Sequence, residues 1–383
     1  MEKKQYQLIV EPITCVHIGT GVELTPLDYY VAKTGEGKHL YCVYDSDSIL
    51  KRIATDKDKF AEFEKLTSQN NMRGLVDFFH KNISTDDIKY PCDVAKEFLD
   101  NYDKNKNIDP LENGRFVQAM YRPAGKKTPV IPGSSIKGAI RTAVLNYKMS
   151  EISDDNYDQL YNDFENEKKK ENFDKKIQAT LLENEENDAK SDPFRSLEIS
   201  DVQFDAKGTQ VVGVLSMIKN NKHTKEVEVC NESQILLEMI KGKLLGSSVN
   251  ASGIIRINTA LNTTNQINQS IDLEQIINAC KYFYWQEFEN EYKTFYREAT
   301  DKVDEIVKLK QELQSIKDNE NEFFIRVGRY SQVEFITYEE NFREPKTPVI
   351  KGKQMSYGTT RTVLNFNGQY LPLGWCKCTV SEQ

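Results

Sequence analysis

Between residues 131 and 142 the chain reads Ile131-Pro132-Gly133-Ser134-Ser135-Ile136-Lys137-Gly138-Ala139-Ile140-Arg141-Thr142, and this stretch decides how the fold is interpreted. Pro132-Gly133 ends the apolar run before it, because neither residue continues a regular element easily. The hydroxyls of Ser134-Ser135 then cap a helix. Behind them, apolar residues recur at helical spacing and predict a buried face made of Ile136, Ile140, Ala143 and Tyr147.

The N-terminus of this helix is a candidate phosphate site. Its first N–H groups have no partner within the helix, and the positive end of the helix dipole lies beside them. Lys137 and Arg141 are four residues apart and therefore share one face, from which both can reach phosphates. The alternative is an ordinary helix cap with a solvated charged face. The predicted phosphate contacts are Gly133, Ser134, Ser135, Lys137, Gly138 and Arg141.

The net charge of −8 argues against a nucleic-acid partner until its distribution is considered. Residues 151–192 hold fourteen Asp and Glu against six Lys and Arg, which accounts for the whole imbalance. By contrast, no acid occurs from Asn113 to Ser150, where seven basic residues are interspersed with three aromatic ones. Such a stretch suits a phosphate backbone and unstacked bases. It adds four predicted contacts, Arg115, Arg122, Lys126 and Lys127.

Residues 151–192 are also rich in Asn and Lys and poor in large aliphatic side chains. We expect a charged insertion here, either a solvated helical excursion or a partly disordered segment. It should contribute neither to the core nor to nucleic-acid binding, so that a short Gly/Ser linker would replace it.

Strand and helix patterns on both sides of this insertion predict an α+β fold. Alternating apolar residues predict strands, among them residues 6–16, 197–204 and 332–337. Near-helical spacing from residue 273 to about 313 predicts one long helix. We therefore expect two tandem ferredoxin-like (RRM-like) domains. The first spans residues 1–195 and contains the insertion at about 151–192, and the second spans residues 196–383.

Several classes of protein are not expected. The seven cysteines form no CxxC pair, and Cys376 and Cys378 have no histidine nearby, which argues against disulfides, a metal site and a cofactor. No signal peptide is evident at the N-terminus, and every apolar run is far shorter than the roughly 20 residues that span a bilayer. A cytoplasmic protein without membrane contact is therefore expected.

Residues 131–142 also resemble the signature of the RAMP proteins of CRISPR systems. The resemblance extends to residues 197–204, to Pro372-Leu373-Gly374-Trp375 and to Glu11-Pro12-Ile13-Thr14-Cys15-Val16-His17-Ile18-Gly19-Thr20-Gly21. These segments cover about a fifth of the chain and are spread from end to end. Together they resemble the RAMP subunits that cap the 3′ end of the guide RNA (crRNA) in type III-A (Csm) complexes. The resemblance implies RRM-like domains that bind crRNA.

The resemblance also implies partners and further contacts. The partners are crRNA, target RNA through the complex, the repeated backbone RAMP subunit, the small Csm subunit, and host nucleases that trim the crRNA 3′ end in antiviral defence. Many RAMP proteins carry a glycine-rich loop near the C-terminus, and the similar place here, residues 327–332, has a single glycine. The implied RNA contacts are His17, Gly19, Gly21, Arg326 and Arg329.

Two catalytic alternatives stay open, although a non-catalytic subunit is favoured. His17 fits the general acid or base of a metal-independent RAMP endoribonuclease, in which a 2′-OH attacks. Asp28 lies in a loop similar to the one in which the backbone RAMP subunit carries its target-cleaving Asp, but a lone carboxylate holds a divalent ion poorly. The repeated backbone subunit itself is a third assignment. The chain length, the insertion and the long helix favour a single-copy end cap instead.

Overall fold

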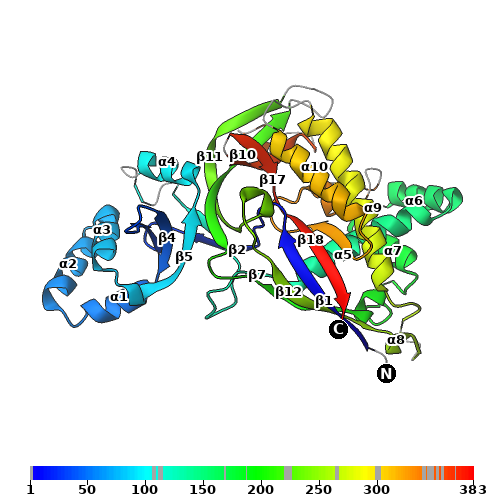
Figure 1. Ribbon diagram of the computed structural model, residues 1–383, viewed down its shortest axis with the longest axis horizontal. Coiled ribbons are helices and arrows are strands. Elements are labelled where there is room, and N and C mark those ends of the chain that lie inside the picture. The colour runs from blue at the N-terminus through cyan, green and yellow to red at the C-terminus, as the bar shows by residue number, and fades with distance from the viewer. Residues whose placement is uncertain are drawn as a thin grey trace.

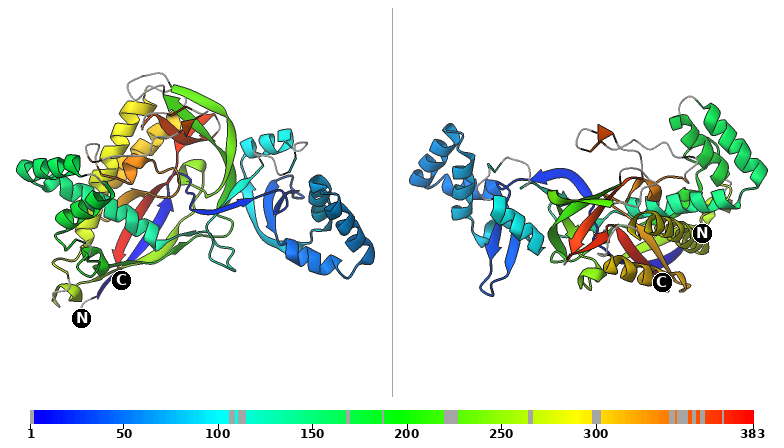
Figure 2. Two further views of the ribbon diagram at one scale, coloured as in Figure 1. Left: turned by 180° about the vertical axis from the view of Figure 1, so that it is seen from behind. Right: turned by 90° about the horizontal axis from the view of Figure 1, so that it is seen from above.

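The structure is a computed structural model. It describes residues 3–383 except 106–108, 111–114, 168–169, 187, 220–226, 264–266, 298–302, 339–341, 343–348, 351–352, 355–357 and 367. The described strands form a five-stranded sheet, a nine-stranded sheet and two two-stranded sheets. Figures 1 and 2 show an elongated molecule with a helical lobe at one end and the paired helices α9 and α10 towards the other.

The five-stranded sheet is built around the N-terminal strand β1 (Lys3–Pro12). Side chains alternate between the two faces of a strand, and Tyr6, Leu8 and Val10 all point into the core. β1 has an antiparallel neighbour on each side, in the order β13-β18-β1-β12-β8. The other strands of the sheet are β8 (Leu197–Ile199), β12 (Ala251–Asn258), β13 (Glu322–Arg326) and β18 (Trp375–Glu382).

Four of these strands, β18-β1-β12-β8, have the antiparallel order of a ferredoxin-like βαββαβ unit. Its two helices are α5 (Gly133–Glu151), which precedes β8, and α9 (Leu273–Glu291), which follows β12. They pack together, and the Tyr284 hydroxyl of α9 donates to the Ala139 carbonyl of α5 at 3.1 Å. The predicted α+β, ferredoxin-like class is confirmed. This unit takes strands from both ends of the chain and therefore extends across residue 195. The domain boundary at residue 195 stays a prediction.

The nine-stranded sheet is centred on the long antiparallel pair β10 (Thr209–Lys219) and β11 (Val227–Ile240). Its main path runs β2-β6-β11-β10-β5-β4-β3, and β16 and β17 join it through β10. The other strands are β2 (Gly19–Leu24), β3 (Tyr29–Lys33), β4 (His39–Tyr44), β5 (Ile88–Val94), β6 (Val117–Met120), β16 (Thr360–Phe366) and β17 (Gln369–Pro372). The two-stranded sheets pair β7 (Val130–Ile131) with β9 (Val202–Gln203) and β14 (Val349–Ile350) with β15 (Lys353–Gln354).

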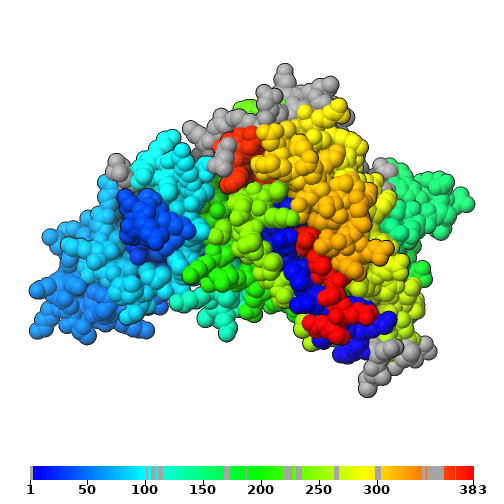
Figure 3. Space-filling model, in the orientation of Figure 1, coloured from blue at the N-terminus to red at the C-terminus, as the bar shows by residue number. Residues whose placement is uncertain are grey.

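A lobe between β2 and β6 projects from the end of this sheet and forms a separate bulge in the space-filling view (Figure 3). In this lobe Tyr44 of β4 and the helical residues Phe78 and Phe79 form a small aromatic core. Its helices are α1 (Ser46–Ile53), α2 (Lys57–Ser68), α3 (Met72–Asn82) and α4 (Lys96–Asn105). Short helical turns of the described chain include η1 (Thr85–Asp87), η2 (Pro193–Ser196), η3 (Lys243–Leu245), η5 (Val333–Phe335) and α8 (Ala260–Thr263).

The acidic segment forms helices α6 (Asp154–Asn166) and α7 (Lys170–Leu182), which agrees with the expected helical excursion and not with the alternative of a partly disordered segment. The expectation that it adds nothing to the core is wrong. Phe164 and Phe173 are buried and pack on Phe342, and the rings of Phe173 and Phe342 are parallel to within 3° at 6.2 Å. Charged residues outnumber the apolar ones here, so the overall composition did not predict the narrow apolar face of these helices. The core residues of the two helices are Leu160, Phe164, Phe173, Ile177, Leu181 and Leu182.

The single long helix expected over residues 273–313 is also a wrong prediction. α9 ends in the π-helical turn η4 (Tyr292–Tyr296), and a second helix, α10 (Asp304–Lys317), packs back against it. Lys310 of α10 pairs with Glu289 of α9 at 2.7 Å. Both helices direct their apolar residues into the same core. The near-helical spacing of apolar residues therefore continues across the turn, and the sequence pattern does not show that the chain reverses there.

Two predicted strands differ from the structure. Residues 332–337 contain the 3₁₀ turn η5 instead of a strand, and Gln332 has a positive φ of 70° that a strand does not allow. Residues 197–204 form two short strands, β8 and β9, interrupted at Ser200. No helix in the described ranges is both long and apolar enough to cross a bilayer.

Candidate nucleic-acid interface

The N-terminus of α5 is closed by the protein itself. The Gly133 amide donates to the Asp201 carboxylate at 2.9 Å, so an acidic side chain takes the acceptor place predicted for a phosphate. A Cβ at Gly133 would lie 2.0 Å from the Ile199 carbonyl oxygen, so only glycine allows this approach of helix and strand. Ser134 is exposed, and a Cβ at Gly138 would meet nothing within 4 Å. The turn therefore serves mainly to join α5 to the end of β8.

Lys137 and Arg141 share one face of α5 as predicted, but each has a partner inside the fold. The Lys137 ammonium donates to the Leu197 carbonyl at 2.7 Å, and burial lowers the pKa of Lys137. Arg141 pairs with Asp192 at 2.8 Å and donates to Gln178 of α7. Both cations hold α5 against its neighbours, and a phosphate would have to share them with these partners.

Three of the predicted arginine contacts lie in the interior. Arg122 is 6% exposed and forms a bidentate pair with the fully buried Glu238, one contact of which measures 2.8 Å. Arg326 is fully buried and pairs with Glu291 at 3.0 Å. Arg115 is buried with its guanidinium 5.2 Å from the Tyr102 ring centroid. The sequence shows the charge of these residues, whereas their acidic or aromatic partners and their burial come from the fold.

The structure does bring together His17, Gly19 and the loop after β13. The Arg329 amide donates to the His17 carbonyl at 2.9 Å. A Cβ at Gly328 would lie 2.4 Å from that same oxygen, and one at Gly19 would lie 3.3 Å from His17 Nε2. The Arg329 guanidinium reaches the Gln118 side chain of β6. The C-terminal loop is thereby fixed against the turn that follows β1.

This loop keeps glycine-type backbone geometry despite its single glycine. Gly328 has a φ of 90° and Tyr330 one of 68°, and Gln332 combines a φ of 70° with a ψ of 154°. The last of these conformations is nearly confined to glycine, and a non-glycine residue held there stores about 1–3 kcal/mol of strain. Ser331 donates to the Gly328 carbonyl at 2.6 Å and helps to hold the loop. Strain of this kind concentrates at functional sites, which directs attention to this loop.

His17 is the chemically unusual residue beneath the loop. Its side chain is 1% exposed, and Nδ1 lies 2.7 Å from the Glu238 carbonyl, so Nδ1 carries the proton and donates. Nε2 is then an acceptor, and it has no hydrogen-bond partner in the part of the chain that the structure describes. Burial lowers the pKa of His17, and the positive charge of Arg329 lowers it further. The imidazole is therefore a neutral acceptor at neutral pH.

Exposed main chain and exposed basic side chains lie on the elements that adjoin His17. β2 is exposed along almost its whole length, including Gly19 and Gly21. Gly21 has a φ of 79°, and a Cβ there would meet nothing within 4 Å. The Tyr121 amide donates to the Ile18 carbonyl at 2.8 Å, which joins the turn at residues 123–127 to the same edge. We call the group that follows the Arg329 surface. It consists of Gly19, Gly21, Lys126, Lys127 and Arg329.

Asp28 is held by its own turn. Its carboxylate accepts from the amide and the hydroxyl of Thr25, both at 2.8 Å. It lies in the helical lobe at the start of β3. Among the described residues no group of three or more His, Cys, Asp or Glu side chains is placed to hold a metal ion.

Glu238 is the residue that sequence reasoning missed. It lies fully buried in β11, pairs with Arg122, and accepts from the Met120 amide at 3.2 Å, while its own carbonyl accepts from His17. In the sequence it is one acid within a strand pattern, and nothing local distinguishes it. Glu238 positions both His17 and the base of the turn that carries Lys126 and Lys127.

The chain belongs to the RAMP superfamily, whose sequence model matches residues 9–333. Among solved structures, one similar chain belongs to the cryo-EM structure of a Csm–crRNA–target RNA ternary complex of a type III-A CRISPR-Cas system. The identity is 18% and the TM-score is 0.65, over 99% of this chain and 100% of that one. The crystal structure of T. onnurineus Csm5 is similar at 19% identity and a TM-score of 0.60, over 96% and 99%. At these identities the likeness is one of fold. A search of curated proteins finds no match.

Proposed function

We propose that this chain is a non-catalytic, crRNA-binding RAMP subunit of a type III-A (Csm) complex that caps the crRNA 3′ end. The observation that carries the proposal is the end-to-end similarity of fold to a chain of a Csm–crRNA–target RNA complex, with nearly complete coverage of both chains. The similarity to T. onnurineus Csm5, again over nearly the whole of both chains, supports the same assignment. The proposed partners are crRNA, target RNA through the complex, the repeated backbone RAMP subunit and the small Csm subunit, with nucleases from elsewhere trimming the crRNA.

The Arg329 surface is the proposed place of crRNA contact. Its cations are exposed, in contrast to the buried Arg115 and Arg326 and to Arg122, whose side chain is 6% exposed. β2 offers an exposed strand with two glycines, where a sugar–phosphate backbone can approach the protein main chain closely. Phosphate contacts position an RNA without reading its sequence, as a subunit that binds every guide requires.

The alternative, an endoribonuclease acting through His17 or Asp28, has less support from the geometry. His17 is almost wholly covered and its Nδ1 is engaged by Glu238, so a scissile 2′-OH would reach Nε2 only after the residues that cover His17 moved. Asp28 is engaged by Thr25 and lies in the helical lobe. The two residues are on separate parts of the fold and do not form one catalytic pair.

Reconstitution of the Csm complex tests the proposal. Complexes assembled without this chain should lack one end subunit and carry crRNA with altered 3′ ends, and native mass spectrometry should find one copy of the chain per complex. The triple variant Lys126→Gln, Lys127→Gln, Arg329→Gln should bind crRNA more weakly with a smaller salt dependence. Many copies per complex would instead identify the backbone subunit. RNA cleavage by the purified chain that disappears in His17→Ala or Asp28→Ala would establish the nuclease.

A further inference from the structure

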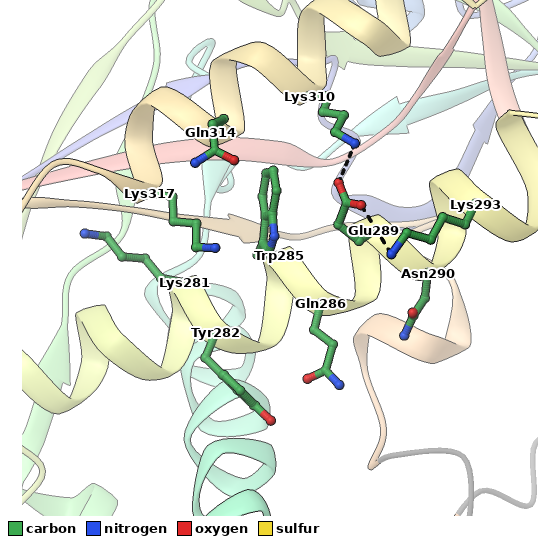
Figure 4. A pocket seen from close by; sticks show the side chains of 10 residues that line it. All are labelled: Lys281, Tyr282, Trp285, Gln286, Glu289, Asn290, Lys293, Lys310, Gln314 and Lys317. Atoms are coloured by element: carbon green, nitrogen blue, oxygen red, sulfur yellow. Dashed lines mark ion pairs between the residues drawn. The ribbon is translucent and has the colours of Figure 1, made fainter.

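An open groove of about 690 Å³ runs between α9 and α10, on the opposite side of α9 from its buried face. Trp285 lies between the two helices, with Lys317 on one side of its ring and Glu289 on the other (Figure 4). Along α9 and the start of η4 the lining extends from Lys281 to Lys293, which at about 1.5 Å per residue is about 18 Å. The groove shares no residue with the Arg329 surface.

The groove carries an excess of positive charge. Its lining has four lysines and one carboxylate, Glu289. Glu289 is already matched by Lys310 at 2.7 Å and Lys293 at 3.6 Å. Lys281 and Lys317 form no ion pair among the described residues. The Lys281 ammonium donates to the Asn319 carbonyl and has two further N–H donors. Three carboxylates outside the lining, Glu322, Asp318 and Glu320, act electrostatically on Lys281, and Glu322 also pairs with Lys377 at 3.4 Å.

Aromatic and amide groups lie between these lysines. Trp285 is half-buried, with the Lys317 ammonium 4.8 Å from its ring centroid, and Tyr282 is 39% exposed. The side-chain amides of Gln286, Asn290 and Gln314 complete the lining and offer both donors and acceptors. Lysines that follow a backbone, rings on which bases stack, and amides that reach base edges are the components of sites for single-stranded nucleic acid.

We propose that this groove binds single-stranded RNA, with phosphates on Lys281 and Lys317 and a base against Trp285. Its length of about 18 Å corresponds to about five stacked nucleotides at about 3.4 Å each. An acidic peptide would use the lysines and leave the rings and amides without a role, so RNA accounts for more of the lining. The inference rests on the proposed function only in taking RNA as the ligand, because the groove and the Arg329 surface are separate.

The chain offers a direct probe of the site. It has two tryptophans, and the other one, Trp375, is fully buried. Adding a short oligoadenylate to the intact protein should therefore quench the fluorescence of Trp285 alone, and Trp285→Phe should abolish the response. Lys281→Gln with Lys317→Gln should weaken the binding that causes quenching. It should also reduce the slope of log K against log salt by about 0.7 for each lysine.

Controls separate this site from other sources of binding. Lys57→Gln with Lys59→Gln makes the same change of charge on the exposed helix α2 and should leave the quenching curve unchanged. The triple variant of the Arg329 surface should still show quenching, which keeps a failure of the groove distinct from a failure of the proposed crRNA contact.

Two results would overturn the inference. The first is that oligoadenylate binds the protein without changing Trp285 fluorescence, or binds equally well after both groove lysines are replaced. The second is quenching by an oligoglutamate peptide but not by oligoadenylate, which would make the groove a protein-docking surface.

Discussion

Replacing Phe173 by alanine tests whether α6 and α7 belong to the folded core. Phe173 is 3% exposed, and its ring packs on Phe164 at 5.1 Å and on Phe342 at 6.2 Å between centroids. Removing a buried phenylalanine ring typically costs about 3–5 kcal/mol of the free energy of unfolding, through lost burial and the cavity that remains. Because two ring partners are lost as well, we expect Phe173→Ala to lie within this range.

The matched control is Phe60→Ala on α2, which removes the same side chain from a site that is 40% exposed. Its effect should stay within about 0.5 kcal/mol, as for most surface substitutions. Urea unfolding followed by circular dichroism measures both variants at the same pH and salt concentration. If Phe173→Ala proved as mild as Phe60→Ala, the acidic segment would be the dispensable insertion that its composition indicates, and the packing described here would be refuted.

Three further predictions concern the interior around the candidate interface. Arg122→Gln should lower the free energy of unfolding by about 3–5 kcal/mol, because it leaves the buried Glu238 unpaired. The control Lys127→Gln should change RNA affinity and not stability. Equal urea midpoints for the two variants would contradict this prediction. Gly328→Ala should lower the free energy of unfolding by at least about 1–2 kcal/mol and weaken crRNA binding. The reasons are that residue 328 has a φ of 90° and that an added Cβ would clash with the His17 carbonyl. An unaltered melting temperature would show that the loop moves freely. Burial lowers the pKa of His17 and of His80, so below the ordinary value of 6.5 the unfolded chain binds protons that the folded protein does not. Stability should therefore fall as the pH drops from about 7.5 to about 5.5, and less so in His17→Asn with His80→Asn, as urea titrations at both values would measure.

Local pattern was sufficient for much of the fold. The alternation in β1 and the Pro-Gly-Ser-Ser start of α5 both predicted the observed elements. These signals are carried by neighbouring residues, so one sequence contains them. The antiparallel return of α10 onto α9 was missed because both helices present apolar residues to one core, and periodicity does not register a change of direction.

The candidate site was harder to predict, because its chemistry depends on distant partners. Arg122 looked like a phosphate ligand until the fold placed it against Glu238, 116 residues away in the chain. Arg141 was assigned to RNA from its spacing, but Asp192 neutralises it from 51 residues away. Composition reports how many charges a segment has, and only the tertiary contacts decide which of them face solvent.

The central position of β1 has a consequence for the synthesis of the chain. One neighbour of β1 is β18, and the pairing of Tyr6 with Glu382 joins the first described strand to the last. At a translation rate of about 5–20 residues per second, β1 leaves the ribosome roughly 20–80 seconds before β18 is made. During that time one edge of β1 has no strand to pair with, and contacts of such long sequence separation form slowly. The five-stranded sheet is therefore completed only once β18 has left the ribosome, and nascent chains that stop before Trp375 should remain sensitive to protease within β1.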